Sequence, residues 1–113
     1  MIIARLSILA AVLLSATPAA AIPPSSVTDT RDPARQAAFC AAFLYDDVRS
    51  RSGADRRRGT GALNAWRAEL QRLRPGDAGH FFQSALEVND NAPRDARASA
   101  VVYCQSHAPR RGR

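Results

Sequence analysis

Lysine is absent from this chain of 113 residues, and all sixteen basic residues are arginine. Histidine and cysteine occur only twice each, which argues against a structural zinc site, because such a site needs about four ligands. Beyond the N-terminal region no apolar run reaches the roughly 20 residues that cross a bilayer. The chain has room for one small domain, and its length excludes a multidomain enzyme.

Hydrophobic residues make up 46% of the chain and charged residues 23%, and the formal net charge is +6. These fractions are close to those of globular proteins, so they predict a compact soluble domain rather than a disordered polyelectrolyte. The positive charge suits an acidic partner or a polyanion. A merely solvated basic surface is the alternative interpretation of the same arginines.

The first 21 residues have the order of a secretory signal peptide. Arg5 supplies the positive charge, residues 6–14 form an apolar run, and Ala19-Ala20-Ala21 provides small side chains for cleavage after Ala21. A membrane anchor is the alternative, but the apolar run is well short of a bilayer span. We therefore expect an exported protein, periplasmic or secreted, whose mature chain begins at Ile22.

The two cysteines, Cys40 and Cys104, both remain in the mature chain. In an oxidising compartment a pair of cysteines in a domain this small predicts a single disulfide. Catalytic dithiols are usually close together, as in Cys-x-x-Cys, so a redox function is the weaker hypothesis.

Apolar spacing and helix-start signals divide the mature chain into helices and connections. We expect a flexible N-terminal arm over residues 22–31 and a helical domain over residues 32–108, followed by a basic disordered tail at 109–113. Within the domain we predict helices at 32–49, 62–73, 77–88 and 91–106, with a mobile basic loop at 50–61. Cys40 and Cys104 fall on the apolar stripes of the first and last of these helices.

The predicted fold class is therefore all-α, a small four-helix bundle or orthogonal helical array stapled by one disulfide. In layout it is similar to several groups of small exported bacterial helical proteins, including acid-stress chaperones and immunity proteins against periplasmic toxins. No motif of these groups aligns with the chain, so no residue takes a role from them.

No catalytic constellation stands out, and we expect no cofactor, no metal and no enzyme activity. His80 next to Asp77 is the one pair that could act as acid and base if a nucleophile faced it. No glycine-rich phosphate loop precedes a helix, and no serine lies in a nucleophile elbow.

Two candidate binding surfaces remain. One is an anion- or partner-binding set of arginines, Arg49, Arg51, Arg56, Arg57 and Arg58. The other is an apolar partner patch formed by Tyr45, Phe81 and Phe82, since neighbouring phenylalanines on a helix cannot both point into the core. We therefore expect a non-enzymatic binding protein of the cell envelope, whose partner is a protein or an anionic polymer or lipid. A periplasmic stress chaperone, a toxin-immunity or inhibitor protein, and a small enzyme using His80 are the alternatives.

Overall fold

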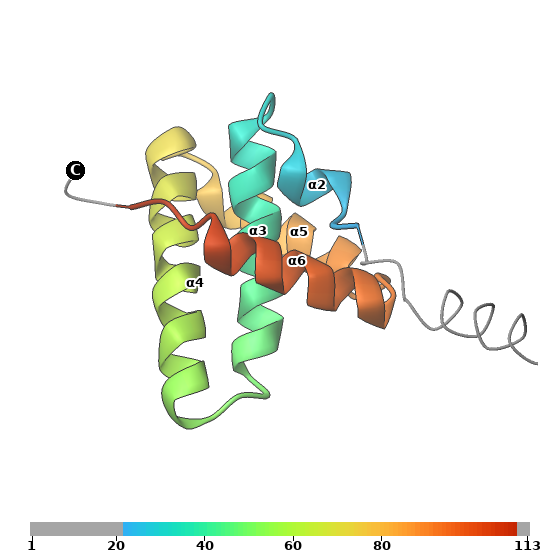
Figure 1. Ribbon diagram of the computed structural model, residues 1–113. Coiled ribbons are helices and arrows are strands. Elements are labelled where there is room, and N and C mark those ends of the chain that lie inside the picture. Colours follow the sequence, from blue (N-terminus) through green and yellow to red (C-terminus); the bar gives the residue numbers. More distant parts are fainter. Residues whose placement is uncertain (1–21, 111–113) are drawn as a thin grey trace, which may run out of the picture.

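A computed structural model of the chain describes residues 22–110, and this part is all-helical (Figure 1). Its helices, labelled as in Figure 1, are α2 (Ser25–Thr28), α3 (Pro33–Val48), α4 (Gly53–Leu73), α5 (Ala78–Asn89) and α6 (Arg94–Ser106). The described residues contain no strand, so the predicted all-α class is confirmed. The expected leader, residues 1–21, and the last three residues of the expected tail lie outside the described part.

Helix α3 is the centre of the fold and contacts the four other helices. It begins where the sequence predicts, because the Asp32 carboxylate accepts a hydrogen bond from the Arg35 amide at 3.2 Å and Pro33 occupies the first turn. Its inner face carries many alanines, and Leu44 and Phe43 add the large apolar groups. Small side chains let neighbouring helices approach closely from several sides.

Helix α4 lies beside α3 and runs in the opposite direction (Figure 1). It begins at Gly53, so the predicted mobile loop over residues 50–61 is wrong, and most of that segment is the first half of α4. Gly53, the first residue of α4, has a φ of +60°, which residues with an L side chain rarely adopt, so the turn into the helix suits glycine. Gly59 is buried against Val48 of α3. The interhelical contact is therefore made by a glycine, and a search for apolar side chains at helical spacing does not detect it.

Helix α5 packs on α3, and α6 crosses α3 and reaches α4 (Figure 1). Both agree with the predicted helices to within a few residues at each end. Ala85 of α5 and Ala100, Val101 and Cys104 of α6 are buried, as their spacing indicates.

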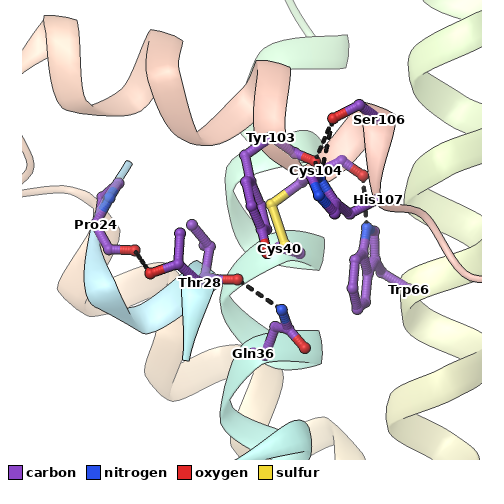
Figure 2. The surroundings of a disulfide bond; sticks show 10 residues. Pro24, Thr28, Gln36, Cys40, Trp66, Tyr103, Cys104, Ser106 and His107 are labelled. Atoms are coloured by element: carbon purple, nitrogen blue, oxygen red, sulfur yellow. Dashed lines mark hydrogen bonds between the residues drawn. A yellow bond between two sulfur atoms is a disulfide. The ribbon is translucent and has the colours of Figure 1, made fainter. Parts of the chain in front are cut away.

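The disulfide between Cys40 of α3 and Cys104 of α6 is present and fully buried (Figure 2), which confirms the predicted bond. Trp66 of α4 donates a hydrogen bond from Nε1 to the Cys104 carbonyl oxygen at 2.8 Å. The last turn of a helix leaves carbonyl groups without intrahelical partners, so this indole satisfies one of them in a buried position. The staple and the hydrogen bond together join α3, α4 and α6 at one point.

Residues 22–31, expected as an arm ahead of the domain, contribute to the core through Val27, whose exposed fraction is 0%. The Gln36 side chain donates a hydrogen bond from Nε2 to the Val27 carbonyl at 2.7 Å, which ties α2 to α3 (Figure 2). Val27 stands alone among Pro, Ser and Thr residues, so no repeat of apolar residues marks it. The sequence pattern therefore could not predict that Val27 is buried in the core.

Among residues 22–110, no helix combines the length and apolar character that a membrane span requires.

Candidate functional site

A half-open groove of about 650 Å³ lies between the C-terminal end of α3, the start of α4 and one face of α6. We call it the α6 groove. Its floor is formed by the buried Phe43 of α3 and Val101 of α6, and its exposed apolar lining comes from Ala98 and Val102 of α6. Val102 is 67% exposed. Charged side chains of both signs surround these apolar groups. The groove therefore combines an apolar surface with groups that could fix the orientation of a ligand.

The carboxylates along the α3 and α4 side of the groove already have donors. Arg51 donates hydrogen bonds to Asp47, with an ion-pair distance of 3.0 Å, and Arg58 pairs with Asp55 at 3.3 Å. The hydrogen bonds that Arg51 donates to Asp47 raise the pKa of Arg51 above its ordinary value. On this side of the groove, the negative charges of Asp47 and Asp55 are thus balanced by the positive charges of Arg51 and Arg58.

Asp46 is the third carboxylate in the groove, and its partner comes from α5. Asn89, which is 1% exposed, donates from Nδ2 to Asp46 Oδ2 at 3.4 Å, while its Oδ1 atom has no hydrogen-bond partner. A buried amide oxygen without a hydrogen-bond partner is costly, so Asn89 adds little net stability through this contact.

On the α6 side the charge is positive. Arg94 and Arg97 both line the groove, and within residues 22–110 neither forms an ion pair with a carboxylate. They lie three positions apart, so their side chains share one face of the helix with Val101 and Val102. The α6 side can therefore accept anionic groups next to an apolar surface.

The structure separates the five arginines predicted as one binding set. Arg51 and Arg58 line the α6 groove in the ion pairs described above, and Arg49 lies over the Tyr45 ring with its Cζ atom 5.6 Å from the ring centroid. Arg56 and Arg57 lie beside a separate shallow hollow along α4. Because residues 53–58 are helical, their side chains point around the helix instead of gathering in a loop.

The aromatic residues predicted as an apolar patch are half-buried and covered in part by guanidinium groups. Tyr45 and Phe82 contact each other edge to face, with ring centroids 5.7 Å apart. Arg67 lies over Phe82 at 5.3 Å and Arg74 over Phe81 at 4.6 Å. Such contacts place cations over ring faces, so arginine side chains share this surface with Tyr45, Phe81 and Phe82.

In the described residues the acid–base candidate Asp77 is bonded to Arg74 and not to His80. The Asp77 carboxylate accepts hydrogen bonds from Arg74 at 3.0 and 2.7 Å, and these bonds hold the pKa of Asp77 below its ordinary value. His80 is exposed, and no hydrogen bond joins it to Asp77. In the part of the chain that the structure describes, no group of three or more histidine, cysteine or carboxylate side chains could hold a metal ion.

Sequence reasoning missed Arg94 and Arg97, although a signal was available. The groove-lining residues of α6 recur with helical spacing and form one stripe: Arg94, Arg97, Ala98, Val101, Val102 and Gln105. The search for clustered charge favoured the arginines at 49–58 because they are adjacent in sequence. Residues that are adjacent in a helix point to different faces, whereas residues three or four positions apart lie on the same face.

No known protein family, no curated protein and no solved structure matches this chain.

Proposed function

We propose that the mature chain is an exported, non-enzymatic binding protein that holds a segment of a protein partner in the α6 groove. The observation that carries the proposal is the combination of an apolar groove lining with two arginines, Arg94 and Arg97, that have no carboxylate partner in the described residues. An apolar surface supplies binding free energy, and nearby unpaired charges supply orientation and selectivity.

The volume of the groove supports this assignment. At about 650 Å³ it falls within the range of roughly 300–1,000 Å³ that is typical of ligand sites. The groove is half open, so a short peptide segment can enter it without a movement of the domain. The arginine-covered aromatic patch on α3 and α5 is less suitable, since a partner would first have to displace the guanidinium groups.

We propose export through the leader at residues 1–21, with cleavage after Ala21, and a final location in the periplasm or the medium. The buried disulfide supports this location, because such bonds form and persist in oxidising compartments. We further propose that helices α3 to α6 form an orthogonal array that this bond staples during folding outside the cytosol.

Affinity capture from envelope and secreted fractions tests the function, using the mature chain from Ile22 onward with its disulfide intact. Ala98 lines the groove, so Ala98→Trp fills it with a large ring. Asn64→Trp is the matched control, because Asn64 is exposed and lies beside the hollow along α4. We expect one stoichiometric protein that the wild type and Asn64→Trp retain at moderate salt and that Ala98→Trp loses.

Equal retention by both tryptophan variants would contradict binding in the groove. Capture of nucleic acid or lipid alone, released by moderate salt, would contradict a protein partner and favour non-specific attraction by the basic surface.

A further inference from the structure

Most arginines in the described part of the chain have a local partner. Ion pairs hold five of them: Arg31, Arg51, Arg58, Arg72 and Arg74. Aromatic rings lie under Arg35, Arg49 and Arg67. Within residues 22–110, those left without either kind of partner are Arg56, Arg57, Arg94, Arg97 and Arg110.

Two of the unpartnered arginines differ from the others in their surroundings. Arg94 and Arg97 border the apolar surface of the α6 groove. Arg56 and Arg57 lie along an exposed face of α4 next to Gly53 and Gly61, where even an added Cβ atom would meet nothing within 4 Å. All four arginines are exposed, but an anion at Arg94 and Arg97 would also lie against the groove lining, whereas one at Arg56 and Arg57 would stay in water. Partial exclusion of water by the lining strengthens the attraction between opposite charges.

We infer that the α6 groove recognises an acidic peptide segment, with carboxylates against Arg94 and Arg97 and an apolar side chain on Ala98 and Val102, the exposed apolar residues of the lining. The inference rests on the proposed function and names the chemistry of its partner segment. Arginines three positions apart on a helix lie roughly one turn apart, which matches two carboxylates with similar spacing on the partner. Each guanidinium can donate two parallel hydrogen bonds to a carboxylate.

The opposite side of the groove distinguishes an acidic peptide from a nucleic acid. Asp46, Asp47 and Asp55 line that side, and Asp47 and Asp55 retain their own arginine partners. A nucleic acid carries a phosphate at every nucleotide, so it would bring further negative charge against these carboxylates. A peptide can place its carboxylates on the α6 side alone and present neutral or basic groups to the aspartates. The apolar lining adds contact area that a phosphate backbone does not use.

The test uses the disulfide-bonded mature chain and a short fluorescein-labelled peptide. In this peptide two glutamates lie three positions apart, with leucine and phenylalanine between them, and a matched peptide carries glutamine at both positions. Fluorescence anisotropy at about 0.15 M salt measures binding to the wild type, to Arg94→Gln/Arg97→Gln and to the control Arg56→Gln/Arg57→Gln. Both double variants lower the net charge by the same amount. A difference in peptide affinity between them therefore reports where the arginines lie, not the loss of charge.

We expect Arg94→Gln/Arg97→Gln to weaken binding of the glutamate peptide about tenfold or more, and the control to weaken it less than about threefold. The glutamine peptide should lose about as much affinity for the wild type as the groove variant loses for the glutamate peptide. Circular dichroism of each variant checks that the fold is retained.

Three results would overturn the inference: equal weakening by the two double variants, equal affinity for the two peptides, and no saturable binding of the glutamate peptide. Displacement of the peptide by single-stranded DNA that also requires Arg94 and Arg97 would assign the groove to nucleic acid instead. If both peptides bind equally and Ala98→Trp abolishes their binding, the groove remains a binding site and only its acidic selectivity is wrong. If Ala98→Trp changes nothing for a bound peptide, the proposed function itself fails.

Discussion

Two glycines of α4, Gly59 and Gly61, should respond in opposite directions to the same substitution. Gly59 lies where α3, α4 and α6 meet: a Cβ atom added there would lie 2.7 Å from Val48 Cγ1 and 3.8 Å from Gln105 Nε2. At Gly61 an added Cβ would meet nothing within 4 Å. Both residues lie inside the same helix, so the intrinsic effect of replacing glycine by alanine is shared. The contact with Val48 is what differs.

The magnitudes follow from two opposing contributions. Alanine stabilises a helix interior by about 0.5–1 kcal/mol relative to glycine, so Gly61→Ala should stabilise the protein by about that amount. Adding a methyl group to a filled position costs about 1–3 kcal/mol, and the β-branched Val48 cannot easily turn aside. Gly59→Ala should therefore destabilise the protein by roughly 1–2 kcal/mol after the helical gain is subtracted.

Urea unfolding followed by circular dichroism at fixed pH measures both variants against the wild type. In a thermal experiment the Gly59→Ala midpoint should fall by about 5–10 °C, and the Gly61→Ala midpoint should rise by a few degrees. Equal stabilisation by the two substitutions would refute the close approach of α4 to Val48. The position of α4 against α3, and with it one side of the α6 groove, would then need revision.

Three further predictions concern the Cys40–Cys104 disulfide, the Trp66 hydrogen bond and the titration of Asp77. Cys40→Ala/Cys104→Ala should lose about 4 kcal/mol of unfolding free energy, because the disulfide closes a loop with a sequence separation of 64; thiol titration of the native wild type that finds two free thiols would contradict the bond. Trp66→Phe should cost about 1–2 kcal/mol in urea unfolding, since the buried Cys104 carbonyl loses its donor, and an unchanged midpoint would contradict that contact. Asp77 has a pKa below its ordinary 3.8, mainly through the Arg74 hydrogen bond, so its contribution to stability is present above pH 3.8 and disappears as the pH falls through the lowered value. Arg74→Gln should raise that pKa toward 3.8 in a carbon-detected NMR titration, and Arg72→Gln, whose arginine pairs with Glu69, should leave it unchanged.

The helical class, the disulfide and most helix ends follow from the sequence because strong local signals mark them. Asp32-Pro33 begins α3, and apolar residues at helical spacing define the inner faces of α4 and α6. Cys40 and Cys104 fall on inner faces, and with only two cysteines a single pairing exists.

The first half of α4 could not be predicted, because tertiary contact rather than local pattern holds it. Its sequence contains three glycines and three arginines, and the contact that places it on α3 is made by Gly59, which has no side chain. Intrinsic propensity disfavours a helix with so many glycines, and the packing against Val48 outweighs it. Val27 escaped prediction for a related reason, since a single apolar residue has no period.

The sequence predicts a binding site at the arginines of residues 49–58, and the α6 groove contains only part of that set. A basic surface was expected, and two of its five predicted arginines, Arg51 and Arg58, do line the α6 groove. Both are engaged with aspartates, so the free charge comes from Arg94 and Arg97, which are more than thirty residues away in sequence. Only the crossing of α6 over α3 brings these two groups of residues together (Figure 1).

Site-specific photocrosslinking in intact cells tests most directly that the α6 groove holds a partner. A photoreactive phenylalanine derivative at Val102 lies in the groove, and the same group at Asn64 lies on the exposed face of α4. We expect one discrete protein adduct from position 102 that excess glutamate peptide suppresses in isolated envelopes, and no such adduct from position 64. The same adducts from both positions, or none from position 102, would contradict partner binding in the groove.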